Sequence, residues 1–225
     1  MAVKEQPQAP ARRRSLVEPT EPSAEPFRTL RVALELVPDS RRGNIIVFTS
    51  ADPGEGKSTI AANYALVSAV NERRVLLVDA DLRNPAQHAI FGIPRSPGLT
   101  EVIFSRLDPY TTARSIEGVP GLHVLSAGRP ILRAGDITGA TVVRDLLTQL
   151  SGEYDIVVVD TPPTLSTADA AHIAAHPAAD VAVVVNKDQG TRRVRRAVSK
   201  LELVGANLLG FVVNREGRLS DYGYS

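Results

Sequence analysis

The fold is decided by the stretch Thr49-Ser50-Ala51-Asp52-Pro53-Gly54-Glu55-Gly56-Lys57-Ser58-Thr59. An apolar, strand-like run (residues 44–48) precedes it, and a helical run (residues 60–65) follows it. This order is typical of a phosphate-binding loop, in which backbone N–H groups surround a polyphosphate and the next helix points its N-terminus inward. Ala51 replaces the first glycine of the G-x-x-x-x-G-K-[ST] pattern, but the remaining run between a strand and a helix is a specific signal.

The residues of this loop have distinct expected roles. Gly54 and Gly56 allow the backbone to approach a phosphate closely. We expect Lys57 to reach the β- and γ-phosphates of a nucleotide and Ser58 to offer its hydroxyl to Mg²⁺. The predicted nucleotide contacts are Asp52, Pro53, Gly54, Glu55, Gly56, Lys57, Ser58 and Thr59.

Composition favours a globular enzyme. The 225 residues are 43% hydrophobic and 23% charged, which suits one α/β domain with a sizeable core. A net charge of +1 argues against nucleic acid as the main partner. The chain has no cysteine, so disulfides and Cys-based metal sites are excluded, and no apolar run reaches the roughly 18 residues of a membrane span. We therefore expect a soluble, cytoplasmic chain.

Apolar runs alternate with helical stretches after the loop. The strand candidates are nearly continuous in Val, Ile and Leu, as expected of parallel strands buried on both faces. They cover residues 75–78, 122–125, 155–159, 181–185 and 208–213, and the helical stretches between them include residues 142–150, 168–175 and 192–203. The pattern predicts an α/β fold with a doubly wound, mainly parallel sheet of the P-loop NTPase type, and ligands at the carboxyl ends of its strands.

Aspartates follow two of these strands. Asp79 and Asp81 come after the strand at 75–78, and Asp160 comes after the strand at 155–159. Strand-end aspartates can also be helix caps or turn formers. Beside a phosphate loop, however, their place is that of carboxylates that organise Mg²⁺.

Three motifs resemble those of one known family. Asp79-Ala80-Asp81-Leu82-Arg83 is similar to its second Walker-type motif, Asp160-Thr161-Pro162-Pro163 to its Walker B motif, and Glu25-x-x-Arg28-x-x-Arg31 to its E-x-x-R-x-x-R motif. The family is that of the bacterial tyrosine kinases of capsule and exopolysaccharide systems, within the deviant Walker superfamily. The resemblance extends from about residue 25 to the C-terminus. The sequence departs from the family in its segment 128–136 and in having only two tail tyrosines.

The resemblance implies a mechanism. ATP with Mg²⁺ would supply a phosphoryl group to Tyr222 and Tyr224 in the tail of a neighbouring subunit. Lys57, Asp79 and Asp81 would be catalytic, with Asp79 accepting the tyrosyl proton. Ser58, Asp81 and Asp160 would hold Mg²⁺, and Asn214 would contact adenine, although a turn-forming role is open for Asn214.

The resemblance also implies an organisation. Residues 1–24 are rich in Pro, Glu, Ala and Arg with little apolar periodicity, and this composition by itself predicts a flexible arm. By the resemblance, residues 25–216 would be the kinase domain and residues 217–225 a flexible tyrosine tail. Glu25, Arg28 and Arg31, on one helix face, would assemble subunits into a ring. A membrane adaptor of the chain-length-determinant type would recruit the chain to the inner face of the plasma membrane.

Two other functions are open at this stage. The first is an ATPase switch of the partition or septum-positioning kind. Its signature lysine would fall at Asp52, and a glycine would fall at Pro53, so the sequence lacks both. The second is a scaffold that binds nucleotide without transferring phosphate, against which the retained Lys57, Asp79 and Asp81 argue.

Overall fold

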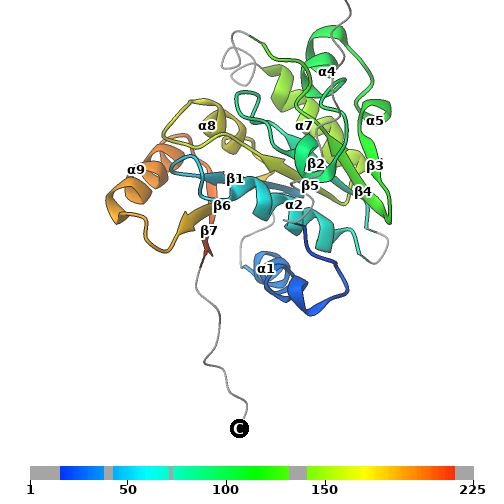
Figure 1. The fold of residues 1–225 in the computed structure, drawn as a ribbon. Coiled ribbons are helices and arrows are strands. Elements are labelled where there is room, and N and C mark those ends of the chain that lie inside the picture. The colour runs from blue at the N-terminus through cyan, green and yellow to red at the C-terminus, as the bar shows by residue number, and fades with distance from the viewer. Residues whose placement is uncertain (1–15, 38–42, 71–72, 132–140, 216–225) are drawn as a thin grey trace, which may run out of the picture.

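The computed structural model describes residues 16–37, 43–70, 73–131 and 141–215. Within them lies one sheet of seven strands in the order β3-β4-β2-β5-β1-β6-β7 (Figure 1). β3 is antiparallel to β4, and all other neighbouring pairs are parallel. The strands are β1 (Ile45–Ser50), β2 (Val75–Asp79), β3 (Arg114–Ile116), β4 (Val119–Leu125), β5 (Ile156–Asp160), β6 (Ala179–Asn186) and β7 (Asn207–Asn214). The predicted doubly wound α/β fold is confirmed.

Helices cover both faces of the sheet. One apolar cluster joins α1, α2 and α3 to the sheet, and a second joins α4, α7, α8 and α9 to the opposite face. Alternate residues of β1 serve the two clusters, because successive side chains of a strand point to opposite faces. The helices are η2 (Pro22–Ala24), α1 (Glu25–Leu36), α2 (Lys57–Ser68), α3 (Gln87–Phe91), α4 (Leu99–Ser105), α5 (Pro109–Thr112), α7 (Thr141–Glu153), α8 (Asp169–Ala174) and α9 (Thr191–Glu202).

The strand register sets the position of the site. β2 and β5 are parallel neighbours, and Asp79 lies opposite Asp160 at the last residue of each. β1 is the other neighbour of β5 and leads through residues 51–56 into α2. The phosphate loop and the strand-end aspartates therefore meet at one edge of the sheet, as parallel strand ends must.

Several short elements were not predicted. β3 has three residues, and its pairing with β4 shifts register between Ser115 and Ile116. α3, α4 and α5 contain only five, seven and four residues. Elements this short carry less than one or two periods of apolar patterning, so the periodicity that predicted the long helices gives no signal for them.

The predicted flexible arm differs from the structure in its last third. Leu16 and Val17 pack against the cluster that contains α1 and α2, and the amide of Val17 donates to Asn63 Oδ1 at 2.8 Å. Ala24 is fully buried. The Pro- and Glu-rich composition gave no sign that this segment packs against the domain, because the packing depends on a few apolar side chains and one long-range hydrogen bond. Residues 1–15 lie outside the described residues.

The residues of the E-x-x-R-x-x-R motif lie on α1. Arg28 pairs with Glu25 of its own helix at 2.7 Å, and its Nη1 and Nη2 donate to the carbonyls of Pro19 (2.7 Å) and Glu21 (3.2 Å). Arg28 therefore fastens the segment before α1, a contact that the sequence did not predict. The ring-forming role of Glu25, Arg28 and Arg31 stays a prediction. Within the described ranges, no helix is both long enough and apolar enough to cross a bilayer.

Candidate nucleotide-binding site

The phosphate loop connects β1 to α2 through two left-handed glycines. Gly54 has a φ of 83° and Gly56 a φ of 90°, values that an L side chain rarely adopts. Gly56 is also the N-cap of α2, so the backbone N–H groups of the first turn of α2 follow the loop directly. A Cβ atom on Gly56 would lie 2.1 Å from Asn214 Nδ2. Glycine is therefore favoured at this position by the lack of space as well as by its positive φ.

Buried polar contacts within the loop fix its shape. Glu55 is 3% exposed, and its Oε2 accepts a hydrogen bond from the Asp52 amide at 2.9 Å. Burial raises the pKa of Glu55. Ser50 Oγ donates to the Asp52 carbonyl at 2.8 Å. The Glu55 side chain therefore stabilises the conformation of the loop from within. Its predicted contact with the nucleotide stays a prediction.

The end of β7 holds the loop from one side. Asn214 Nδ2 donates to the Glu55 carbonyl at 2.8 Å, and Arg215 Nη2 donates to the Gly54 carbonyl at 3.1 Å. The predicted contact between Asn214 and adenine remains a prediction, but Asn214 does lie at the loop. Arg215, in the left-handed region with φ 59°, was missed, because a residue just past a strand carries no sequence signal for this contact.

α9 holds the loop from another side. The guanidinium of Arg193 pairs with both oxygens of Asp52, and Gln189 Nε2 lies 3.4 Å from Asp52 Oδ2. The hydrogen bonds from Arg193 outweigh the partial burial of Asp52 and lower its pKa. Arg193 therefore neutralises the partly buried carboxylate of Asp52, at the position where the partition-type proteins would carry their signature lysine.

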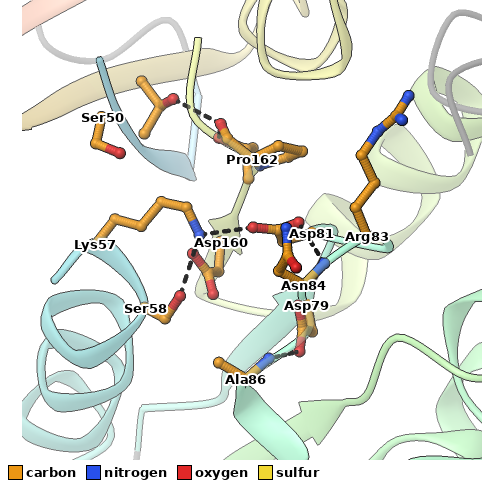
Figure 2. A network of polar contacts seen from close by, with 12 residues as sticks. Ser50, Lys57, Ser58, Asp79, Asp81, Arg83, Asn84, Ala86, Asp160 and Pro162 are labelled. Atoms are coloured by element: carbon orange, nitrogen blue, oxygen red, sulfur yellow. Dashed lines mark hydrogen bonds and ion pairs between the residues drawn. The ribbon is translucent and has the colours of Figure 1, made fainter. Parts of the chain in front are cut away.

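The functional side chains converge on Lys57 (Figure 2). Lys57 Nζ lies 2.9 Å from Asp81 Oδ2, 3.3 Å from Asp160 Oδ1 and 3.2 Å from Ser58 Oγ. Burial alone would lower the pKa of Lys57, but the charges of Asp160 and Asp81 outweigh it and the pKa is raised. The structure thus brings together the predicted loop lysine and two of the predicted Mg²⁺ carboxylates.

Asp79 lies deeper than these groups. It is fully buried, and its Oδ2 accepts hydrogen bonds from the amides of Ala86 (3.0 Å) and Gln87 (2.9 Å). Its Oδ1 has no hydrogen-bond partner among the residues that the structure describes. Burial and the adjacent Asp160 carboxylate raise the pKa of Asp79 well above its ordinary value. The predicted proton acceptor is thus a buried carboxylate with one uncommitted oxygen.

Gln87 is a further site residue that sequence reasoning missed. It is fully buried at the start of α3, and its Nε2 donates to Asp160 Oδ2 at 2.8 Å and to the Ser58 carbonyl at 3.0 Å. With its backbone amide on Asp79, this one residue ties together the ends of β2, β5 and the phosphate loop. The only available signal was a polar residue eight positions after Asp79, in a stretch with no recognisable periodicity.

The residues present fit a nucleotide with Mg²⁺. Among the described residues, no group of three or more His, Cys, Asp or Glu side chains is arranged to hold a metal ion. Mg²⁺ in phosphate-binding sites is usually held by one or two carboxylates together with the phosphates of the substrate, so a three-carboxylate cage is not required. Asp81, Asp160 and Ser58 are hard oxygen ligands gathered around one amine. The two left-handed glycines agree with a loop shaped for polyphosphate.

The remaining predicted residues fall into two groups. Pro53 lies in the loop, and Thr59 lies in the first turn of α2, where its carbonyl accepts a hydrogen bond from Asn63 Nδ2 at 2.9 Å. Tyr222 and Tyr224 lie outside the described residues.

Comparison with known proteins identifies the chain's relatives. The tyrosine-protein kinase YwqD of Bacillus subtilis (strain 168) is 32% identical over 212 residues, which cover 93% of this chain and 89% of that protein. The chain belongs to the bacterial tyrosine-protein kinase family. A family model described as ParA, NUBPL iron-transfer P-loop NTPase, matches residues 41–221, which places the chain among the P-loop NTPases.

Two further comparisons extend this result. The tyrosine-protein kinase ptk of Acinetobacter johnsonii is 32% identical over 89% of this chain, but the chain spans only 27% of that protein. The solved kinase domain of the Escherichia coli tyrosine kinase ETK has a TM-score of 0.80 and 28% identity, covering 92% of this chain and 82% of that domain. The chain therefore corresponds to nearly all of one relative and to about a quarter of another.

Proposed function

We propose that this chain is a protein-tyrosine kinase that transfers the γ-phosphoryl group of ATP to Tyr222 and Tyr224 of a neighbouring copy. The observation that carries the proposal is the position of Lys57, held between Asp81 and Asp160 beside a glycine-rich phosphate loop. In the transfer, the tyrosine oxygen forms a bond to the γ-phosphorus, the bond between that phosphorus and the β,γ-bridging oxygen breaks, and ADP leaves.

Lys57 would exchange one set of anions for another during this reaction. In the structure its charge is taken up by Asp81 and Asp160. The phosphates of ATP are stronger attractors for a lysine point charge at such a loop, so binding would draw Nζ toward them and release the two carboxylates. Those carboxylates, with Ser58, would then hold Mg²⁺, which supplies charge neutralisation of the phosphate oxygens.

Asp79 would accept the tyrosyl proton. A carboxylate whose pKa is raised by burial is a stronger base than an exposed one, and Asp79 has such a raised pKa. Because Oδ2 already accepts two amide hydrogen bonds, the accepting atom would be Oδ1. Gln87 would keep the neighbouring Asp160 oriented while the proton moves.

The organisation of the system is also part of the proposal. Subunits would form a ring through Glu25, Arg28 and Arg31, so that the tail of one subunit reaches the site of the next. A membrane adaptor of the chain-length-determinant type would recruit and activate the chain at the inner face of the plasma membrane. The activity would regulate capsular or exopolysaccharide synthesis and export, as the family resemblance implies.

Intact-mass spectrometry after incubation with Mg²⁺ and ATP tests the proposal. The wild type, Lys57→Met and Tyr222→Phe/Tyr224→Phe are each assayed with and without the cytoplasmic segment of the adaptor, and Tyr110→Phe is the matched tyrosine control. We expect phosphate additions to the wild type and the control, and none to the other two. ATP hydrolysis without any phosphate addition, even with the adaptor, would refute the kinase proposal.

A further inference from the structure

A groove of about 510 Å³ runs along α9, outside the nucleotide site. We refer to it as the α9 groove. Its lining includes Leu165, Arg192, Arg195, Arg196, Ser199 and Leu203, and no acidic residue is among the described residues that line it. The groove is therefore strongly cationic, with an apolar margin.

The α9 groove lies next to the phosphate loop. The amide of Leu165 donates to the carbonyl of Ala51, the first residue of the loop, at 3.3 Å. Arg193, on the same turn of α9 as Arg192, pairs with Asp52. Lys200, which also lines the groove, donates to the carbonyls of Thr164 (2.6 Å) and Thr167 (2.7 Å) and so fixes α9 to the segment after β5. A ligand in this groove would therefore lie beside the phosphate loop.

The arginines of the groove make no ion pair that would stabilise α9 within the described residues. Arg192, Arg195 and Arg196 are exposed, and none of them forms an ion pair with a carboxylate in the described part of the chain. Like charges three and four residues apart destabilise a helix. Cations in the first turns also oppose the helix dipole. An anionic ligand would offset both penalties.

The other lining groups indicate which anion the groove suits. Guanidinium groups bind phosphate through paired, charge-assisted hydrogen bonds, and the hydroxyls of Thr191 and Ser199 offer further donors. Leu203 is 86% exposed and, with Leu165, gives an apolar surface for a flat ring. A phosphate and an aromatic ring are the two parts of a phosphotyrosine side chain.

We propose that the α9 groove binds phosphotyrosine in the segment of residues 216–225 of a second copy of this chain. The proposal rests on the proposed function, because that reaction produces phosphotyrosine at Tyr222 and Tyr224. The two tyrosines are about 7 Å apart along an extended chain. The groove would retain the first phosphorylated tyrosine beside the active site while the second one enters, so that both are modified in one encounter.

Peptide binding to the full chain tests this proposal without ATP. The probe is a fluorescein-labelled peptide of residues 216–225, either unphosphorylated or phosphorylated at Tyr224. We expect the phosphopeptide to bind the wild type about tenfold more tightly than the unphosphorylated peptide, the effect of one or two charge-assisted hydrogen bonds. Arg195→Glu/Arg196→Glu should lose this preference. Arg106→Glu/Arg144→Glu, which changes the net charge equally at exposed positions, should keep it.

The outcomes separate the two proposals. Equal binding of both peptides by the wild type, or an unchanged preference in Arg195→Glu/Arg196→Glu, would overturn the phosphotyrosine site even if the chain proves to be a kinase. If the chain transfers no phosphate to tyrosine under any condition, the proposed function fails, while the peptide preference is still measured. Thermal unfolding of each variant verifies folding, which exposed arginines should not affect.

Discussion

Lys57 and Asp81 form a buried ion pair, with Nζ 2.9 Å from Oδ2. The same amine contacts Asp160 at 3.3 Å. One lysine therefore offsets one of the two negative charges that Asp81 and Asp160 bring to the ends of β2 and β5. The residue expected to bind the nucleotide also stabilises the site in its absence.

Replacing Lys57 with Met should destabilise the chain as well as abolish transfer. Breaking a buried ion pair by removing one partner typically costs about 3–5 kcal/mol, because the remaining charge stays unpaired. Mg²⁺ should restore part of this loss by replacing the missing positive charge between Asp81 and Asp160. Thermal unfolding with and without Mg²⁺ measures both effects. A Mg²⁺-induced rise in Tm no larger in Lys57→Met than in the wild type would contradict the competition between lysine and metal.

Gln87 should be a positioning residue. Gln87→Leu keeps most of the volume but leaves Asp160 Oδ2 and the Ser58 carbonyl without their donor, at about 1–3 kcal/mol for each unsatisfied buried group. We expect kcat to fall with a smaller change in KM for ATP, because the loop that binds phosphate is intact while the carboxylate is misaligned. Gln149→Leu, the same change at an exposed position of α7, is the control. An equal fall in both variants would argue against positioning.

Asp79→Asn should change how stability depends on pH. The folded-state pKa of Asp79 is raised, so the folded chain binds this proton more tightly than the unfolded chain, and stability falls as pH rises from the unfolded pKa of about 4 through the folded value. Asn keeps an oxygen for the two amides but has no proton to lose. The stability of Asp79→Asn relative to wild type should therefore increase with pH across this window. Chemical denaturation from about pH 4 to about pH 8 measures this difference in the free energy of unfolding. Parallel stability curves for the two proteins would refute the raised pKa of Asp79.

Transfer kinetics of the same variant address the proton acceptor. If Asp79 Oδ1 takes the tyrosyl proton, Asp79→Asn should lose transfer while still binding ATP. Asp81→Asn should instead weaken the response to Mg²⁺. The reverse pattern would exchange the two roles.

Gly56→Ala and Asn214→Ala should be coupled. Alanine at either Gly54 or Gly56 must adopt a left-handed backbone, at about 1–2 kcal/mol. At Gly56 the new Cβ would meet Asn214 Nδ2, whereas no atom of the described residues lies within 4 Å of a Cβ at Gly54. Asn214→Ala should therefore reduce the cost of Gly56→Ala and leave that of Gly54→Ala unchanged. Additive effects in all pairs, measured by denaturant unfolding, would show that the contact does not constrain the loop.

Arg28→Ala should loosen the segment before α1. Its guanidinium binds two carbonyls of this segment and Glu25, so its loss should expose residues 16–24 to limited proteolysis. Arg31→Ala removes the next arginine of the motif and is the control for charge. Cleavage at the same rate in both variants would mean that the hydrogen bonds of Arg28 do not hold the segment.

Sequence patterning predicted the parts of the molecule whose form depends on neighbouring residues. The long apolar strands, α2 after the glycine-rich loop, and the aspartates at the ends of β2 and β5 all follow from local order plus the parallel arrangement. Convergence of Lys57 with Asp81 and Asp160 followed in turn, because parallel strands end at one edge.

The contacts that sequence did not predict are those made between distant segments. Three side chains contact the site from segments whose structure does not depend on it: Gln87, Arg193 and Arg215. The residues next to them in the sequence give no indication of these contacts. Val17 likewise joins Asn63 across 46 positions of sequence. Side-chain placement of this kind depends on the assembled fold, which periodicity does not encode.

The contacts of Asn214 and Arg215 with the phosphate loop set a limit on trimming the chain. A polypeptide cut after Arg215 would keep both donors to the loop carbonyls. A polypeptide cut after Val213, only two residues earlier, would still contain almost all of the sheet but would leave the carbonyls of Gly54 and Glu55 without these partners. The C-terminal boundary of the domain is therefore set at Arg215 by hydrogen bonds to the loop. This boundary lies two residues beyond Val213, where the hydrophobic core is already complete.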